Sequence, residues 1–324
     1  MKPLSAEAYL AGIREGNRVL LSQAITLVES TLDSHRSLAQ EIVNGCLSLS
    51  GNSFRTGITG APGVGKSTFI DALGISLIEE GKKVAVLAID PSSEKTSGSI
   101  LGDKTRMARL SRHKNAFIRP SPSSGTLGGI ASRTREVIVL CEAAGFDLIF
   151  VETVGVGQSE FRVHQLVDML LLLIITGAGD DLQGIKRGIM EMADAIIINK
   201  ADDNNVQPAR QLKRMIRQAV HVLPDPREGW QTQVFDVSSS NDSGFAEVAS
   251  LMAEFKSKMQ DSNAFEANRA NQSLSWMRRH IEEGLLRRLK EDKRLSQAIK
   301  DLEKQVIAGT KNPVEAAETI LNML

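Results

Sequence analysis

Short runs rich in apolar residues alternate with helical patterns through the middle of the 324-residue chain, and this alternation most constrains its fold. Strands whose apolar residues do not alternate with polar ones are buried on both faces. Strands that alternate with helices form βαβ units, in which the crossover helices cover a parallel sheet. The pattern predicts an α/β fold with a mostly parallel central sheet flanked by helices. Its strands are expected at Thr56–Thr59, Val84–Ile89, Ala116–Ile118, Leu148–Val151, Met169–Ile175, Ala195–Ile198 and Val234–Val237.

Both ends of the chain lack strand patterns. Apolar residues at helical spacing predict a helical extension over residues 1–50 and a helical arm over residues 261–324, around an α/β domain at 51–260. The arm mixes many charges of both signs with an apolar stripe that includes Ile281 and Leu285. We therefore expect the arm to pack against a second copy of the chain and to form a homodimer.

Charge and cysteine content exclude several classes of protein. The 39 Lys and Arg residues balance 39 Asp and Glu residues, whereas binding to nucleic acid or an anionic membrane by charge requires a basic excess. Cys46 and Cys141 are isolated, which argues against a disulfide framework and favours a reducing compartment. No apolar leader is evident, and the run Met169–Ile175 is far shorter than the ~20 residues of a membrane span. We expect a cytoplasmic protein with neither a nucleic-acid nor a membrane partner.

The segment after the first expected strand fits the phosphate-binding pattern GxxxxGK[ST]. In such a loop, backbone amides and the N-terminus of the following helix surround the phosphates of a nucleotide. Lys66 is expected to contact the β- and γ-phosphates, and Ser67 to bind Mg²⁺. The predicted nucleotide-binding residues here are Gly60, Ala61, Pro62, Gly63, Val64, Gly65, Lys66, Ser67 and Thr68.

Acidic residues at the ends of neighbouring strands are candidates for completing the Mg²⁺ site. Asp90 and Glu152 each follow an apolar strand, at the sheet edge where ligands bind, and Asp103 lies in the polar segment after Asp90. Each also fits a helix cap or a turn, and for Asp103 that interpretation is nearly as strong. Glu152 is a further candidate for orienting the attacking water.

The segment Glu152-Thr153-Val154-Gly155 stands where GTPases carry DxxG, with Glu in place of Asp. Gly155 permits a backbone amide to approach the γ-phosphate. The next position is Val156 rather than the water-positioning Gln of Ras-type enzymes, and the role of Gln158 is left open. This departure predicts slow intrinsic hydrolysis that another component stimulates.

The sixth expected strand ends in Asn199-Lys200-Ala201-Asp202, the NKxD pattern that recognises guanine, 133 positions after Lys66. An ionised Asp only accepts hydrogen bonds, so Asp202 matches the N1–H and amino group of guanine, a donor pair that adenine lacks. A polar loop without function is the weaker interpretation. Ser238 and Ser239, after the last strand, are expected to contact the base through backbone amides. GTP, GDP and Mg²⁺ are therefore the predicted ligands.

With these motifs in place, the sequence resembles the MeaB/ArgK/MMAA family of P-loop GTPases of the SIMIBI class. The resemblance implies a dimeric metallochaperone whose partner is methylmalonyl-CoA mutase and whose GTP hydrolysis gates adenosylcobalamin loading and protects the mutase. It implies switch regions at Asp90–Asp103, Glu152–Gln158 and Gly177–Gly188, with Gln183 and Lys186 coupling the partner to hydrolysis. The residues alone favour a catalytic Lys186 no more than a surface lysine. The matching segments are 60–68, 88–93, 98–107, 119–129, 151–160, 177–191 and 199–202.

Three alternative functions fit the residues less well. A P-loop kinase acting on a small molecule or protein would use ATP, against which the guanine pattern argues. A nickel-insertion GTPase needs Cys and His ligands, whereas the five histidines are scattered and the two cysteines isolated. A non-catalytic interaction module is disfavoured because Lys66, Ser67 and Asp90 are all present.

Overall fold

The computed structural model of the chain describes residues 3–90, 106–122, 127–153, 159–177 and 187–323. The chain divides into two compact units, Met1–Arg269 and Ala270–Leu324, and each is described by itself. The predicted division at residues 50 and 260 stays a prediction.

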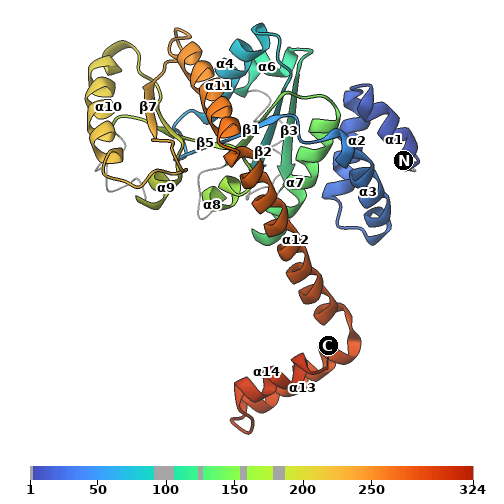
Figure 1. Cartoon of the computed structure of the whole chain (residues 1–324). Helices are drawn as coiled ribbons and strands as arrows, with labels where there is room; N and C mark the ends of the chain where they lie inside the picture. The colour runs from blue at the N-terminus through green and yellow to red at the C-terminus, as the bar shows by residue number, and fades with distance from the viewer. Residues whose placement is uncertain (1–2, 91–105, 123–126, 154–158, 178–186, 324) are drawn as a thin grey trace. The chain divides into compact units, whose positions relative to one another are not determined.

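A seven-stranded sheet in the order β3-β2-β4-β1-β5-β6-β7 forms the centre of the first unit (Figure 1). Every neighbouring pair runs parallel, so the predicted α/β architecture is confirmed, with a sheet that is parallel throughout the described strands. The expected strands are all present, within a few residues of their predicted ends. They are β1 (Phe54–Gly60), β2 (Val84–Asp90), β3 (Ala116–Pro122), β4 (Leu148–Thr153), β5 (Met169–Ile174), β6 (Ala195–Ile198) and β7 (Gln233–Asp236).

Strand β5 shows why the apolar runs do not alternate with polar residues. All six of its residues are buried, and successive side chains point to opposite faces of the sheet. Met169 and Leu171 join one hydrophobic cluster, whereas Leu170 joins the cluster on the other face. Helices cover both faces, so both sets of side chains must be apolar.

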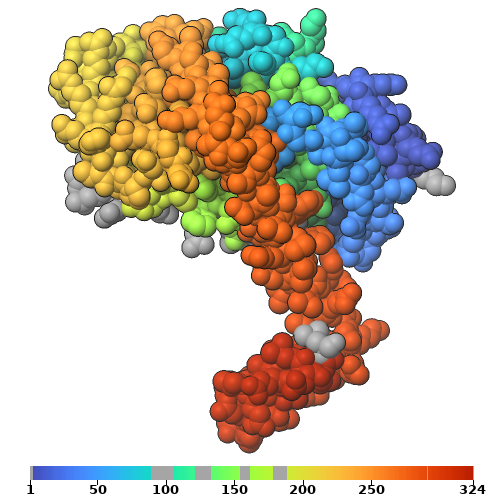
Figure 2. Space-filling view, viewed as in Figure 1, coloured from blue at the N-terminus to red at the C-terminus, as the bar shows by residue number. Residues whose placement is uncertain are grey.

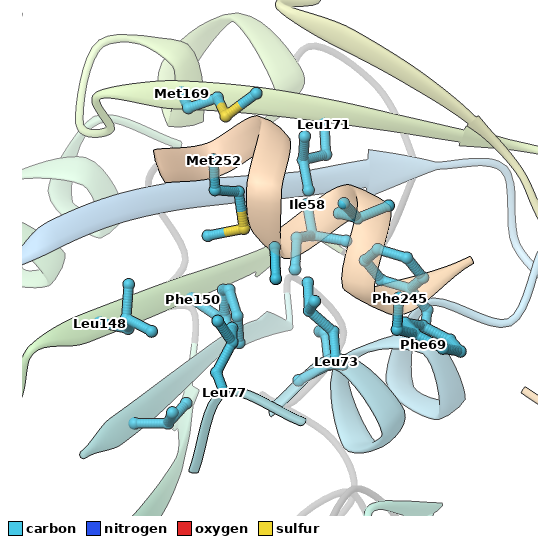
Figure 3. Close-up of a cluster of buried hydrophobic side chains, with 14 of the residues drawn as sticks. Ile58, Phe69, Leu73, Leu77, Leu148, Phe150, Met169, Leu171, Phe245 and Met252 are labelled. Atoms are coloured by element: carbon cyan, nitrogen blue, oxygen red, sulfur yellow. The ribbon is translucent and has the colours of Figure 1, made fainter. Parts of the chain in front are cut away.

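Helices α4 (Lys66–Glu79), α6 (Ala108–Arg112) and α11 (Phe245–Asp261) cover one face of the sheet. Figure 3 shows Phe69, Leu73 and Leu77 of α4 and Met252 of α11 converging on the strands. Phe69 and Phe245 join α4 to α11 directly, with ring centroids 5.6 Å apart. Burying each such side chain contributes about 1.5–3 kcal/mol to folding.

The opposite face is covered by α7 (Leu127–Ala143), α8 (Ser159–His164) and the N-terminal helices. These are α1 (Ala6–Arg14), α2 (Arg18–Glu29) and α3 (Asp33–Cys46), followed by a short 3₁₀ turn at Leu47–Leu49. Helices α2 and α3 pack against α7, so the N-terminal extension is part of the first unit, and its surface adjoins the rest of that unit in Figure 2. Cys46 and Cys141 are buried, free thiols within this layer.

Beyond β5 the sheet is covered by α9 (Arg187–Met192) and α10 (Val206–Val220), with a 3₁₀ turn at Asp203–Asn205 before α10. Helix α12 (Ala264–Glu291) begins in the first unit, where Phe265 stacks on Phe54 with ring centroids 6.4 Å apart. The second unit contains the rest of α12, then α13 (Lys293–Ile307) and α14 (Pro313–Leu321). Helices α13 and α14 pack against each other.

A buried ion pair ties α7 to β1. Arg55 donates two hydrogen bonds to the Glu142 carboxylate, at 2.8 and 3.0 Å, and Ser53 and the Gly51 amide donate two more. Burial by itself raises the pKa of Glu142, but the hydrogen bonds and the charge of Arg55 outweigh it and hold the pKa below its ordinary value of 4.5. The pair therefore stabilises the fold above about pH 4.5, and this contribution is lost as the pH falls through the lower pKa of the folded state.

Glu142→Gln should lower the free energy of unfolding at pH 7 by about 3–5 kcal/mol, because Arg55 is left buried beside a neutral amide. Urea denaturation at pH 7 and at several pH values below 5 measures the effect. The difference from the unmodified protein should shrink as the pH falls, since Glu142 then becomes protonated. Glu41→Gln, at an exposed position of α3, is the control. Equal stability of both variants at pH 7 would contradict this account.

Candidate functional site

The phosphate-binding pattern lies between the end of β1 and the start of α4, as predicted. Gly60, Gly63 and Gly65 have φ angles of 149°, 82° and 92°, in a region that side chains disfavour. A Cβ at position 60 would lie 2.4 Å from the Leu173 carbonyl oxygen, and one at position 65 would lie 2.7 Å from Asn199 Nδ2. Two of these glycines are therefore required by close contacts as well as by backbone conformation.

The remaining residues of the loop occupy different environments. Val64 is buried in the core, whereas Ala61, Pro62 and Thr68 are exposed. The buried Lys66 donates hydrogen bonds from Nζ to the carbonyl oxygens of Gly60 (2.8 Å) and Ala61 (3.2 Å). Its ammonium group is thus held against the loop that the motif defines.

Ser67 and Glu152, both predicted to serve the metal, lie in contact. The Ser67 hydroxyl donates to Glu152 Oε1 at 3.0 Å. Glu152 reaches this position because β4 lies beside β1 with Ile58 opposite Glu152. The next residue, Thr153, donates to Thr59 Oγ1 at 3.0 Å and so joins the same two strand ends.

The backbone of Asp90 ends β2 at the same edge of the sheet, two residues beyond Ala88, which lies opposite Glu152. The Asp90 side chain is outside the described part of the chain. Asp103, Gly155, Gln158, Gln183 and Lys186 also lie outside the described residues. Within the described ranges, no group of three or more His, Cys, Asp or Glu residues is placed to hold a metal.

The NKxD segment follows β6 and contacts the phosphate-binding loop directly. Asn199 is buried, and its Nδ2 donates to the carbonyl oxygens of Val64 (2.9 Å) and Gly65 (3.4 Å). The exposed Lys200 donates to the Gly63 carbonyl at 3.1 Å. Two motifs that lie far apart in the sequence therefore form one continuous site.

Asp202 is held by the segment Val237–Gly244, which links β7 to α11 and is called the β7–α11 loop below. The Ser238 hydroxyl donates to Asp202 Oδ2, and the Ala201 amide donates to the Val237 carbonyl at 2.9 Å. Ser238 is fully buried and Ser239 half-buried. The sequence predicted that these serines would present backbone amides to the base, but the Ser238 amide donates to the Ser243 carbonyl at 3.0 Å. The sequence also missed the side-chain contact of Ser238 with Asp202.

Asn205 is a supporting residue that sequence reasoning also missed. Its Nδ2 donates to the Lys200 carbonyl at 2.5 Å, and its Oδ1 accepts from the Thr176 hydroxyl. Lys200 has a φ of 58°, a left-handed backbone conformation that residues other than Gly, Asn and Asp rarely adopt. No pattern in the sequence distinguishes Asn205 from any other polar residue that begins a helix.

Two buried polar atoms at this edge are available to a polar ligand. Asn199 Oδ1 and Ser239 Oγ are among the buried side-chain atoms of the described residues that have no hydrogen-bond partner. Leaving such an atom unsatisfied costs about 1–3 kcal/mol. Both belong to segments that the sequence assigned to the base of a nucleotide.

No helix in the described part of the chain is long and apolar enough to cross a membrane.

Comparison with known proteins gives one family. Residues 21–294 match the model of the family described as methylmalonyl-CoA mutase-associated GTPase MeaB. The GTPase ArgK of Escherichia coli is 48% identical over 277 residues, which cover 86% of this chain and 84% of that protein. The mitochondrial methylmalonic aciduria type A homolog of mouse is 44% identical over 320 residues, covering 96% of this chain and 77% of that protein.

A solved structure described as a LAO/AO transport system kinase has a similar fold. Its TM-score is 0.78 at 36% sequence identity, and the match covers all of this chain and 98% of that one.

Gly65→Ala should weaken guanine-nucleotide binding strongly, because the new Cβ would displace Asn199 from the phosphate-binding loop. Gly81→Ala is the matched control: Gly81 has a similar φ of 88°, but a Cβ added there would meet nothing within 4 Å. Both variants bear the conformational cost of about 1–2 kcal/mol, which thermal unfolding measures. Titration with a fluorescent GDP analogue should show lost affinity in Gly65→Ala alone. An equal loss in both variants would mean that the contact with Asn199 is irrelevant.

Proposed function

The chain belongs to the family of methylmalonyl-CoA mutase-associated GTPases, and from this premise we propose that its GTP hydrolysis gates adenosylcobalamin loading into methylmalonyl-CoA mutase and protects that enzyme. The family makes the chain a GTPase that binds guanine nucleotides. The names of the family and of its animal relatives connect them to this mutase or to methylmalonic aciduria. The observation that best supports the site is the contact of Asn199 with Val64 and Gly65, which brings the two nucleotide motifs together.

The P-loop residues bind the phosphates in this proposal. The amides from Gly60 to Thr68 and the N-terminus of α4 surround them, and Lys66 turns from the carbonyls of Gly60 and Ala61 towards the β- and γ-phosphates. Lys186, from the third switch region, adds positive charge where negative charge develops in the transition state. The Gly155 amide contacts the γ-phosphate.

The oxygen atoms of Ser67 and Glu152 suit Mg²⁺, which prefers hard oxygen ligands, and the two side chains are in contact at 3.0 Å. Asp90 and Asp103 are the further proposed ligands. When bound, Mg²⁺ neutralises charge that develops on the phosphates. Glu152 also orients the attacking water through its carboxylate.

The guanine base is recognised by Asp202, with the Lys200 side chain along the base plane and Asn199 fixing the loops. Ser238 orients the Asp202 carboxylate through its hydroxyl, and Ser239 presents its backbone amide to the base edge. Because an ionised carboxylate accepts from two donors of guanine, GTP is preferred over ATP.

Partner stimulation tests the proposed role most simply. GTP turnover should rise about tenfold or more when an adenosylcobalamin-dependent methylmalonyl-CoA mutase is added, because the chain's own switch segment lacks the usual water-positioning Gln. Lys66→Ala should show no turnover with or without the mutase. A rate that the mutase leaves unchanged would refute the chaperone role. Recovery of the γ-phosphate on another molecule instead of as free phosphate would favour the kinase alternative.

Asp202→Asn should move the preference from GTP towards xanthosine triphosphate and lower GTP affinity about 10- to 100-fold, because a charged hydrogen-bond acceptor is lost. Competition against a fluorescent GDP analogue measures both nucleotides. Asp203→Asn is the control, since Asp203 is an exposed neighbour that already has a φ of 46°, which Asn tolerates. A clear preference for GTP in Asp202→Asn would show that the base lies elsewhere.

We also propose that the C-terminal helices form the homodimer. In the second unit, α12 exposes four apolar side chains at helical spacing, each about half accessible to solvent: Leu274, Met277, Ile281 and Leu285. Such a stripe suits a helix partner. The dimer should dissociate in a chain that ends after Arg269, which retains the packing of Phe265 and Arg269 on the first unit. Light scattering reports the mass, and a dimer that persists would contradict the proposal.

A further inference from the structure

The guanidinium group of Arg109, on the short helix α6, joins two carboxylates that lie far apart in the sequence. Its Nε donates to Asp71 Oδ2 at 3.2 Å, and its two terminal nitrogens donate to the two oxygens of Asp242 at 3.1 Å each. Asp71 belongs to α4, the helix that begins at Lys66, and Asp242 belongs to the β7–α11 loop. Neither carboxylate belongs to a motif that the sequence analysis singled out.

The Asp71 side of this bridge is rigid. Asp71 accepts a second hydrogen bond from the Leu110 amide at 2.8 Å, and Leu110 and Met107 are fully buried. Leu110 packs so closely on α4 that a Cβ at Gly74 would lie 2.7 Å from its Cδ1. Helix α6 is therefore fixed against the phosphate-binding helix, and α4 in turn packs against α11 (Figure 1).

The Asp242 side of the bridge leads to Asp202. Asp242 has a φ of 50°, and the loop around it is closed by two hydrogen bonds between the backbones of Ser238 and Ser243, each 3.0 Å. Ser238 also donates its hydroxyl to Asp202 Oδ2. A displacement at Asp242 is thus transmitted through one short, closed turn to the residue proposed to read the base.

We propose that Arg109 is a positioning residue for guanine recognition, which fixes the β7–α11 loop to the phosphate-binding helix so that Asp202 is aligned with the base. The inference rests on the proposed role of Asp202. Arg109 acts at a distance, through Asp242 and Ser238. Its function is to keep the base-binding loop and the phosphate-binding helix in one relative position.

The exposure of the three side chains separates this role from a purely structural one. Arg109 is 44% exposed and Asp242 60% exposed, whereas Asp71 is 10% exposed. Ion pairs as exposed as Arg109–Asp242 contribute little to global stability. A guanidinium that donates two parallel hydrogen bonds to one carboxylate nevertheless defines the orientation of that carboxylate. Removal of Arg109 should therefore affect the alignment of the loop more than the stability of the fold.

Inosine diphosphate distinguishes alignment from stability because its base keeps the N1–H of guanine and lacks the amino group. The preference for GDP over inosine diphosphate measures how well Asp202 accepts from both donors. In Arg109→Ala this preference should fall about three- to tenfold, the size of coupling seen between polar groups of one network. The dissociation rate of GDP should rise by a similar factor.

The experiment compares both affinities and the GDP dissociation rate in the full-length protein and in four variants: Arg109→Ala, Asp242→Asn, the double variant and Arg112→Ala. Arg109→Ala and Asp242→Asn should give the same change, and the double variant should give no more than either alone. Arg112→Ala, an exposed arginine on the same helix, should leave both quantities unchanged. Arg109→Lys, which cannot bond two carboxylates in the same way, is used if the alanine variant does not fold. An unchanged GDP preference in folded Arg109→Ala or Arg109→Lys overturns the inference.

Asp202→Asn, measured in parallel, separates the inference from the proposed function. If Asp202→Asn shifts base preference and Arg109→Ala does not, only the role of Arg109 is wrong. If neither variant changes base preference, the assignment of Asp202 is wrong and the inference falls with it. A lower melting temperature of Arg109→Ala without a change in preference would show a structural role and would also overturn the proposal.

Discussion

The architecture of the site depends on the hydrogen bonds from the side-chain amide of Asn199 to the carbonyl oxygens of Val64 and Gly65. They place the loop after β6 against the loop after β1, although β5 lies between the two strands. They also account for Gly65, because the approach of Asn199 leaves no room there for a Cβ. In this arrangement the guanine motif supports the phosphate motif, so the proposed phosphate and base sites form one connected structure.

The parallel sheet makes this contact possible because the carboxyl ends of all its strands meet at one edge. Lys66, Ser67, Glu152, Asn199 and Asp202 lie in or beside the segments that leave those ends. Buried charges stabilise the structure near the opposite ends of the strands. There Glu142 holds Arg55, while Asp168 accepts from the Arg55 amide and from Arg269. Polar groups are thus buried at both edges of the sheet. At the edge away from the candidate site, their described partners are other groups of the protein.

The sequence predicted the fold and the main motifs because both depend on local patterns. The apolar run of β5 indicates a buried strand wherever it occurs, and the spacing from Gly60 to Ser67 is set by the geometry of a phosphate. Contacts made by ordinary residues at a distance could not be predicted. Nothing in the sequence pairs Arg109 with Asp71 and Asp242, because such pairing follows from how α6 and the β7–α11 loop pack. For the same reason, the sequence did not predict the contact of the Ser238 hydroxyl, the supporting role of Asn205 or the buried pair of Arg55 with Glu142.

If Asn199 supports phosphate binding through the loop backbone, its removal must weaken the binding of inorganic tripolyphosphate, which has no base, and this measurement is the most direct test. Calorimetry with Asn199→Ala should show weaker binding of both tripolyphosphate and GTP. The matched variant Asn205→Ala removes only the contacts of that side chain with the Lys200 carbonyl and the Thr176 hydroxyl, so it should weaken GTP binding and leave tripolyphosphate binding unchanged. If Asn199→Ala bound tripolyphosphate as well as the unmodified protein while losing affinity for GTP, the two loops would act independently and the account would be contradicted.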